Sequence, residues 1–267
     1  MNEITERLNF AIRLALEAGR HSMAYFKSTE IGLEFKEDRT PVTRADREAE
    51  EMIRDRLLSE CPDDAVLGEE YGEKTGITGY KWYLDPVDGT ESFVRGVPLF
   101  GTMIGIEKDN EPQIGVIYFP ALKEIIFAAK DEGAKFAIGV DGLNNSFETS
   151  PARVSQTASL SDATLSSTDI LDFRSLGMYA NFSEIMKLIK QYRGWSDCYG
   201  HYLVATGRLD AMIDPIMNVW DTAPLLPIIQ EAGGKYSDLA GEVSIHTGSS
   251  LSSNSLLHEQ LLNLLKA

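Results

Sequence analysis

Three long apolar runs in the first half of the sequence constrain the fold more than any other feature. They are rich in Ile, Val and Phe and have the length of strands. They occupy residues 99–107, 113–120 and 124–130. The turn residues Asp109-Asn110 and Pro120-Ala121 separate them so closely that consecutive runs are expected to pair as antiparallel neighbours. We therefore predict an antiparallel meander, which residues 134–146 continue before ending in a loose loop.

Two helices are predicted before this meander. Residues 3–28 carry apolar side chains every three to four positions, which is typical of an amphipathic helix. A polar connector follows, in which Pro41 excludes a helix. A second helix is expected to begin at Thr43 or Asp46 and to end near Leu58.

The other elements alternate between short strands and helices. Strands are predicted at residues 65–70, 81–86, 163–168, 194–197 and 209–214. Helices are predicted at 181–192, 198–207, 220–234 and 254–267. The helix at 220–234 tolerates Pro224 in its first turn and stops at Gly233-Gly234. The change of pattern near residue 150 predicts two α/β halves, 1–150 and 151–267, in one compact unit with any site between them.

The composition limits the partners that this chain can bind. Among 267 residues there are 25 Lys and Arg but 41 Asp and Glu, a formal net charge of −16, which disfavours nucleic acid and anionic membranes. Two cysteines in no paired motif, and an N-terminus without a signal peptide or membrane span, predict a cytoplasmic protein. Scattered glycines at 133–142 form no dinucleotide fingerprint, so no nucleotide cofactor is expected. A phosphorylated ligand would be repelled unless its site held cations.

Four acidic features follow apolar strands or aromatic residues. They are Glu69-Glu70, Asp85 with Asp88, Asp214 and Asp221. Each alone has an ordinary explanation, such as a solvated loop, a turn or, for Asp221, a helix cap. Because each follows a segment that should carry it to a sheet edge, we expect them to converge rather than to lie on open surface.

Convergent carboxylates are the donor set of a hard cation. Mg²⁺ prefers oxygen ligands and often bridges protein carboxylates to a substrate phosphate, and a pair of such ions can activate water and stabilise a leaving oxygen. Asp85 and Asp88 suit this chemistry because the proline between them stiffens the turn and leaves the Val87 carbonyl available. Gly89 and Thr90 then open a predicted helix whose N–H groups attract anions. This stretch therefore predicts a metal-dependent phosphate site.

Three segments resemble the signatures of the inositol monophosphatase family. They are GEE at 68–70, DPVDGTESF at 85–93 and WDTAPLLPIIQEAGG at 220–234. Their order and spacing agree across nearly the whole chain. The resemblance implies an α+β fold, the layered α-β-α-β-α sandwich of the inositol monophosphatase and fructose-1,6-bisphosphatase type. It also implies a Mg²⁺-dependent phosphatase for a small phosphate ester, generally a homodimer and often inhibited by lithium.

The resemblance implies roles for single residues as well. The metal ligands would be Glu69, Asp85, the Val87 carbonyl, Asp88 and Asp221. Thr90 matches the residue that, with Glu69, orients and deprotonates the metal-bound water, and the Gly89 and Thr90 amides would hold the phosphate. Asp46 matches a weaker third Mg²⁺ position, so two or three ions per site are implied. At Glu91 the chain departs from the family, in which Lys or Thr is common; an outward orientation would keep this acid from the phosphate.

The choice of phosphate ester depends on the second half of the chain. Asp197 and Asp214 are expected to contact the leaving group, and the segment around Asp197 is similar to the histidinol-phosphatase branch. Two carboxylates favour a cationic leaving group through charge-assisted hydrogen bonds, whereas inositol is a neutral polyol. We therefore expect L-histidinol phosphate, an ester of histidine biosynthesis, with myo-inositol 1-phosphate or other sugar phosphates as the alternative. Asp197 could instead lie at a strand end and contact only water.

A hypothesis from a different class is a catalytically silent relative that serves as a metal- or phosphate-binding partner protein. The complete acidic set speaks against it, because a degenerate site would have lost at least one ligand. The four histidines show no metal-ligand spacing, and we expect each to be a surface or satisfied core residue. His201 stands out only because it lies three residues from Cys198, on the helix beside the expected pocket.

Overall fold

The computed structural model describes residues 3–143 and 147–266 of the chain. Its helices are α1 (Glu3–Ser22), α2 (Arg44–Glu60), α3 (Thr90–Val94), α4 (Ile170–Ser175), α5 (Tyr179–Leu188), α6 (Asp197–Ala205), α7 (Val219–Glu231) and α8 (His258–Lys266). Its strands are β1 (Glu34–Phe35), β2 (Pro41–Val42), β3 (Ala65–Gly68), β4 (Gly72–Lys74), β5 (Tyr80–Asp88), β6 (Gly101–Lys108), β7 (Glu111–Phe119), β8 (Glu124–Ala129), β9 (Gly133–Ile138), β10 (Ser150–Pro151), β11 (Thr164–Ser166), β12 (Gln191–Tyr192), β13 (Ala211–Asp214), β14 (Gly234–Ser237) and β15 (Ser250–Asn254). The predicted loose loop falls partly on residues 144–146, which lie outside the described residues.

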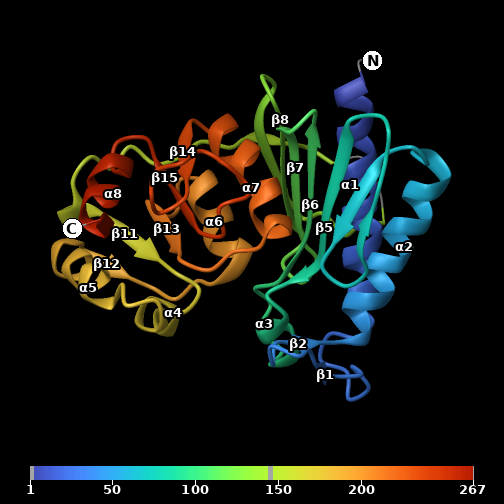
Figure 1. The fold of residues 1–267 in the computed structure, drawn as a ribbon, viewed down its shortest axis with the longest axis horizontal. Helices are drawn as coiled ribbons and strands as arrows, with labels where there is room; N and C mark the ends of the chain where they lie inside the picture. The colour runs from blue at the N-terminus through green and yellow to red at the C-terminus, as the bar shows by residue number, and fades with distance from the viewer. Residues whose placement is uncertain (1–2, 144–146, 267) are drawn as a thin grey trace.

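These elements stack in five layers, which can be followed from right to left in Figure 1. Helices α1 and α2 cover one face of an eight-stranded sheet of order β10-β9-β8-β7-β6-β5-β3-β4. Helices α6 and α7 lie between this sheet and a five-stranded one of order β12-β11-β13-β15-β14, whose far face is covered by α5 and α8. The predicted α-β-α-β-α sandwich is therefore confirmed, while the division of the chain at residue 150 stays a prediction.

The antiparallel meander is confirmed. Strands β6 to β9 pair in sequence order, and Asp109-Asn110 forms the first turn with φ values of 52° and 66°, as a two-residue type I′ hairpin requires. Strand β5 pairs antiparallel with β6 and parallel with β3. The register of β5 against β6 shifts between Asp85 and Asp88, so the strand bulges where these two carboxylates emerge.

Helix α7 approaches the first sheet closely because glycines face it. A Cβ on Gly115 of β7 would lie 2.0 Å from the Pro224 carbonyl oxygen, and one on Gly105 of β6 would lie 2.6 Å from Ala223 Cβ. Both glycines lie within regular strands, so the close approach of α7 is what requires them. This contact sets the distance of α7 from the sheet, and with it the position of Asp221 in the first turn of the helix.

The helix predicted at 181–192 is α5, which ends before residues 191–192 form β12, and three further expectations differ from the structure. Helix α1 ends at Ser22, well before residue 28, because the chain turns there and packs Phe26 against Phe93 and Phe100. Residues 194–197 form no strand, because β12 precedes them and Asp197 already begins α6. The third difference concerns α7, where Pro224 lies beyond the first turn because a capping box starts the helix at Val219. No helix in the described part of the chain is both long and apolar enough to cross a membrane.

Candidate active site

Three carboxylates from two distant parts of the chain converge at the end of β5. Asp85, Asp88 and Asp221 each offer one oxygen such that all three atoms lie within 4.8 Å of one another. Strand β5 supplies two of them around its bulge, and the first turn of α7 supplies the third. Asp85 is only 3% exposed, so its charge is largely removed from water. Three carboxylate oxygens at this spacing, one of them from a buried residue, fit the donor set of a hard divalent cation.

Each carboxylate of this cluster is anchored to a backbone amide through one oxygen. Asp85 Oδ1 accepts the N–H two residues further on at 3.0 Å, and Asp88 Oδ2 accepts the Cys198 N–H of α6 at 2.6 Å. Asp221 Oδ2 accepts the Asn218 N–H at 2.8 Å and completes a capping box. Asp221 therefore caps helix α7, as its ordinary explanation has it, and is also a member of the cluster. The anchors orient side chains that would otherwise repel one another.

The electrostatics of the cluster favour a bound cation. Burial, with repulsion from neighbouring carboxylates, raises the pKa of Asp88 and of Asp221 to about 7. Burial and the charge of Glu69 also raise the pKa of Asp85. A divalent cation would reverse these shifts, because its charge favours the ionised form of every ligand.

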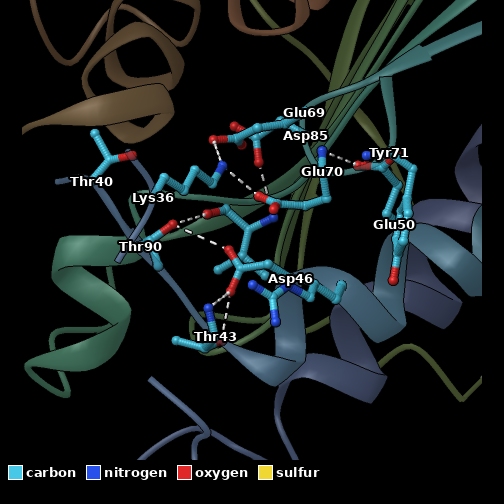
Figure 2. Close-up of polar contacts among 12 residues, drawn as sticks. Lys36, Thr40, Thr43, Asp46, Glu50, Glu69, Glu70, Tyr71, Asp85 and Thr90 are labelled. Carbon is cyan, nitrogen blue, oxygen red and sulfur yellow. Dashed lines mark hydrogen bonds and ion pairs between the residues drawn. The ribbon is translucent and has the colours of Figure 1, made fainter. Parts of the chain in front are cut away.

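A lysine from the loop between β1 and β2 lies among the acidic residues, as Figure 2 shows. Lys36 Nζ lies 2.7 Å from Glu69 Oε1 and 2.7 Å from Glu70 Oε1. Burial opposes the charge of Lys36, but its hydrogen bonds to the two carboxylates raise its pKa above the usual range. Lys36 could not be predicted from the sequence as a site residue, because its polar connector carries no periodic pattern.

Glu50 is fully buried and holds the loop that carries Glu69 and Glu70 (Figure 2). Its Oε2 accepts the Glu70 N–H at 2.8 Å, and its Oε1 accepts the Arg54 Nε–H at 2.7 Å and the Tyr71 N–H at 3.3 Å. Helix α2 thereby sets the position of the predicted metal ligand Glu69. Glu50 could not be predicted from the sequence as a buried residue, since a glutamate within a charged helix indicates a solvated face.

Asp46 and Thr90 are in contact in the lower half of Figure 2. Thr90 Oγ1 lies 3.0 Å from the Val87 carbonyl oxygen and 3.2 Å from Asp46 Oδ1. Asp46 Oδ2 accepts the Thr43 N–H at 2.8 Å and completes the capping box of α2. Burial raises the pKa of Asp46 to about 6. Gly89, with a φ of 82°, precedes Thr90 and caps the short helix α3.

A cavity adjoins the cluster, and its lining combines carboxylates with apolar side chains. Its carboxylates are Asp88, Asp172, Asp197, Asp214 and Asp221, and its apolar side chains include Met103, Ile216 and Leu225. No Lys or Arg lines it among the described residues. Burial and the neighbouring charge of Asp88 raise the pKa of Asp197. The cavity therefore suits a leaving group that carries positive charge, and Asp172 is a lining residue that the sequence analysis missed.

Both carboxylate oxygens of Asp214 contact other groups of the protein. Its Oδ1 accepts the Thr168 N–H at 2.7 Å, and its Oδ2 lies 3.0 Å from His201 Nε2. The other ring nitrogen of His201 lies 2.8 Å from Ser252 Oγ. Asp214 is 2% exposed and His201 is 1% exposed. His201 is thus a satisfied core histidine, one of the two environments that we expected for it.

The additional acid Glu91 faces away from the cluster. Its carboxylate pairs with Arg95 one turn along α3, and its side chain is 60% exposed. The departure from the family pattern at this position therefore adds little charge to the interior of the site.

Comparisons with known proteins agree with this geometry. The sequence model of the inositol monophosphatase family matches residues 3–267. A protein named histidinol-phosphatase from Chlorobaculum parvum is 41% identical over 97% of this chain and 96% of its own length, and one from Mycobacterium tuberculosis is 37% identical over 97% and 98%. The solved structure of an IMPase from Thermotoga maritima has a TM-score of 0.85 and 29% identity over 98% of this chain and 97% of its own.

Enzymes of the matched family depend on metal ions, and the acidic cluster of β5 and α7 provides a donor set for them. The match covers both segments that build the cluster, as well as the loop that carries Glu69. The chain therefore belongs to the inositol monophosphatase family.

Proposed function

We propose that this protein is a Mg²⁺-dependent phosphomonoesterase that converts L-histidinol phosphate to L-histidinol and phosphate. The observation that carries the proposal is the cavity beside the carboxylate cluster, which is lined by Asp172, Asp197 and Asp214 but by no described Lys or Arg. A leaving group with an ammonium and an imidazole would form ion pairs with these carboxylates, whereas a neutral polyol would only donate hydrogen bonds to them. The names of the two relatives support the same ester.

The metal would be held at the carboxylate cluster. Its ligands would be Asp85, Asp88, Asp221, Glu69 and the Val87 carbonyl. Bound Mg²⁺ supplies positive charge that stabilises the transferring phosphoryl group and makes water a stronger acid. Whether two or three ions bind, with Asp46 serving the third, stays a prediction.

The remaining groups would orient the reactants. The Thr90 hydroxyl, which contacts the Val87 carbonyl and Asp46, would orient an attacking water, whose proton Thr90 and Glu69 together would remove. The Gly89 and Thr90 amides at the start of α3 would bind phosphate oxygens. Lys36 neutralises part of the charge of Glu69 and its neighbour, which would let a phosphate dianion approach this acidic protein.

Phosphate release measured with Mg²⁺ tests the proposal, with L-histidinol phosphate and myo-inositol 1-phosphate as the two substrates and a chelator as the control. We expect kcat/KM to be at least about tenfold higher for histidinol phosphate, because the cavity carboxylates form ion pairs with a cationic leaving group but only hydrogen bonds with a neutral polyol. An equal or higher value for inositol phosphate would favour the alternative, an inositol-1-phosphatase or broad sugar-phosphate phosphatase. Release from neither ester would favour a catalytically silent relative. A cytoplasmic location and a homodimer are our predictions from composition and family.

A further inference from the structure

A continuous set of hydrogen bonds crosses the second half of the molecule. It begins at Ser252 of β15, whose Oγ lies 2.8 Å from His201 Nδ1. His201 Nε2 lies 3.0 Å from Asp214 Oδ2 at the end of β13. Asp214 Oδ1 accepts the Thr168 N–H at 2.7 Å, and Thr168 Oγ1 accepts the Asp197 N–H at 3.0 Å.

This network ends at the carboxylate cluster. The residue after Asp197 is Cys198, whose N–H donates to Asp88 Oδ2 at 2.6 Å. Asp197 has a φ of 56°, in the left-handed region that residues other than glycine rarely adopt. Such a conformation persists only where the surroundings hold it, and here the two consecutive N–H groups of Asp197 and Cys198 are both fixed. The direction of the Asp197 side chain therefore depends on Thr168.

The two aspartates predicted to select the substrate have different surroundings. Both oxygens of Asp214 already accept hydrogen bonds, and the residue is 2% exposed. Because a carboxylate only accepts, the shared proton lies on His201 Nε2, and the Ser252 hydroxyl forms the hydrogen bond at Nδ1. Asp197 has its backbone anchored, and its side chain lies at the cavity within the field of Asp88.

We propose that Asp214 and His201 are positioning residues, which act through Thr168 to hold Asp197 at the cavity wall. Asp197 is then the carboxylate that binds the cationic part of the leaving group. This inference rests on the proposed function, and it replaces a direct contact between Asp214 and the substrate.

Replacing each aspartate by asparagine distinguishes a residue that contacts the leaving group from one that only positions another residue. In Asp214→Asn, the amide oxygen can still accept the Thr168 N–H, and the amide nitrogen can donate to His201 once the ring exchanges its tautomer. Because Asp214 lines the cavity without contacting the leaving group, we expect this variant to lower the ratio of kcat/KM for histidinol phosphate over inositol 1-phosphate only slightly. Asp197→Asn should lower that ratio about tenfold or more, because it removes the charge that pairs with the cation. A ratio that falls as far in Asp214→Asn as in Asp197→Asn would overturn the inference.

A matched pair of substitutions at Thr168 tests the positioning role without disturbing the core, since Thr168 lies in an exposed loop. Thr168→Val removes the oxygen that accepts the Asp197 N–H and keeps the branched shape, whereas Thr168→Ser keeps the oxygen. We expect Thr168→Val to raise KM for histidinol phosphate by about tenfold with a smaller change in kcat. Thr168→Ser should have the KM of the wild type. Equal KM values for Val, Ser and wild type, with unchanged thermal unfolding, would contradict the positioning role.

The same variants separate this inference from the proposed function. If wild-type protein releases phosphate from inositol 1-phosphate but not from histidinol phosphate, the proposed substrate is wrong. The role of Asp197 as the cation contact then fails with it, and the positioning step is judged alone by KM for inositol phosphate. A higher KM for inositol phosphate in Thr168→Val, with a wild-type KM in Thr168→Ser, would support the positioning role. Equal KM values in the two variants would refute that role.

Discussion

At Asp88, burial and repulsion act on a side chain that is also a predicted metal ligand. Asp88→Asn removes one charge from the cluster, while the amide oxygen can still accept the Cys198 N–H. Because burial and repulsion raise the pKa of Asp88 to about 7, we expect the metal-free variant to be more stable than wild type. With Mg²⁺, kcat should fall about 100-fold or more, since the charge stabilising the transition state is reduced. Thermal unfolding with and without Mg²⁺, together with phosphate release, measures both effects.

An exposed aspartate serves as the control for this substitution. Asp55→Asn makes the same chemical change on the solvated side of α2, and it should alter neither the metal-dependent gain in melting temperature nor kcat. A near-normal rate of Asp88→Asn at saturating Mg²⁺ would refute the role of Asp88 as a ligand.

Individual residues of the candidate site can be predicted from the sequence only where they lie in a recognisable local motif. Asp85, Asp88 and Asp221 could be predicted because each follows an apolar or aromatic segment within a distinctive motif. Glu50 and Lys36 could not, because their roles depend on partners that only the fold brings near. Glu50 binds backbone amides that begin 20 residues further along the chain, and Lys36 reaches Glu69 across a separation of 33 residues.

Among the elements, α7 is the one whose packing most directly controls the site. Gly115→Ala would place a Cβ against the Pro224 carbonyl, which is backbone and cannot rotate away. We expect α7 to shift outward, to lower the free energy of unfolding by about 1–3 kcal/mol, and to weaken Mg²⁺ binding through Asp221. Urea unfolding and calorimetric titration of Mg²⁺ measure the two effects. Gly194→Ala, where an added Cβ meets open space, should change neither.

Elements without a hydrophobic pattern escaped prediction from the sequence. Strand β15 has the sequence SLSSN, yet all five residues are buried. Three of its four polar side chains have tertiary partners: Ser252 contacts His201, Ser253 contacts His258, and Asn254 donates to Ser155, whereas the Ser250 hydroxyl has none among the described residues. A strand whose burial depends on such hydrogen bonds has neither the alternation nor the apolar content by which strands are recognised. The meander of β6 to β9 has both, and its prediction was confirmed.

On the scale of the whole molecule, the candidate site is assembled from both sheets and the layer between them. Strand β5 of the first sheet supplies Asp85 and Asp88, the middle helices supply Asp197 and Asp221, and β13 of the second sheet supplies Asp214. The stability of the second sheet is therefore part of the stability of the site.

Protonation of His258 is expected to make the stability of the second sheet depend on pH. Its ring is buried, with Nε2 2.9 Å from Ser237 Oγ of β14 and Nδ1 2.7 Å from Ser253 Oγ of β15. Burial lowers its pKa from 6.5 to about 4. The charges nearest to it, Glu259 and Lys235, pair with each other at 3.0 Å and act on it with opposite signs.

Because the unfolded chain binds this proton more tightly, the stabilisation by neutral His258 is complete above the unfolded pKa of 6.5 and is lost as the pH falls toward about 4. Other groups titrate in the same range, so we compare wild type with His258→Gln, in which they are unchanged. Between about pH 7.5 and about pH 5, wild type should lose about 1–2 kcal/mol more unfolding free energy than the variant. Urea unfolding at both pH values measures this difference. Parallel losses in the two proteins would mean that His258 can be protonated within the folded core, and that the junction of α8 with the second sheet is open to water.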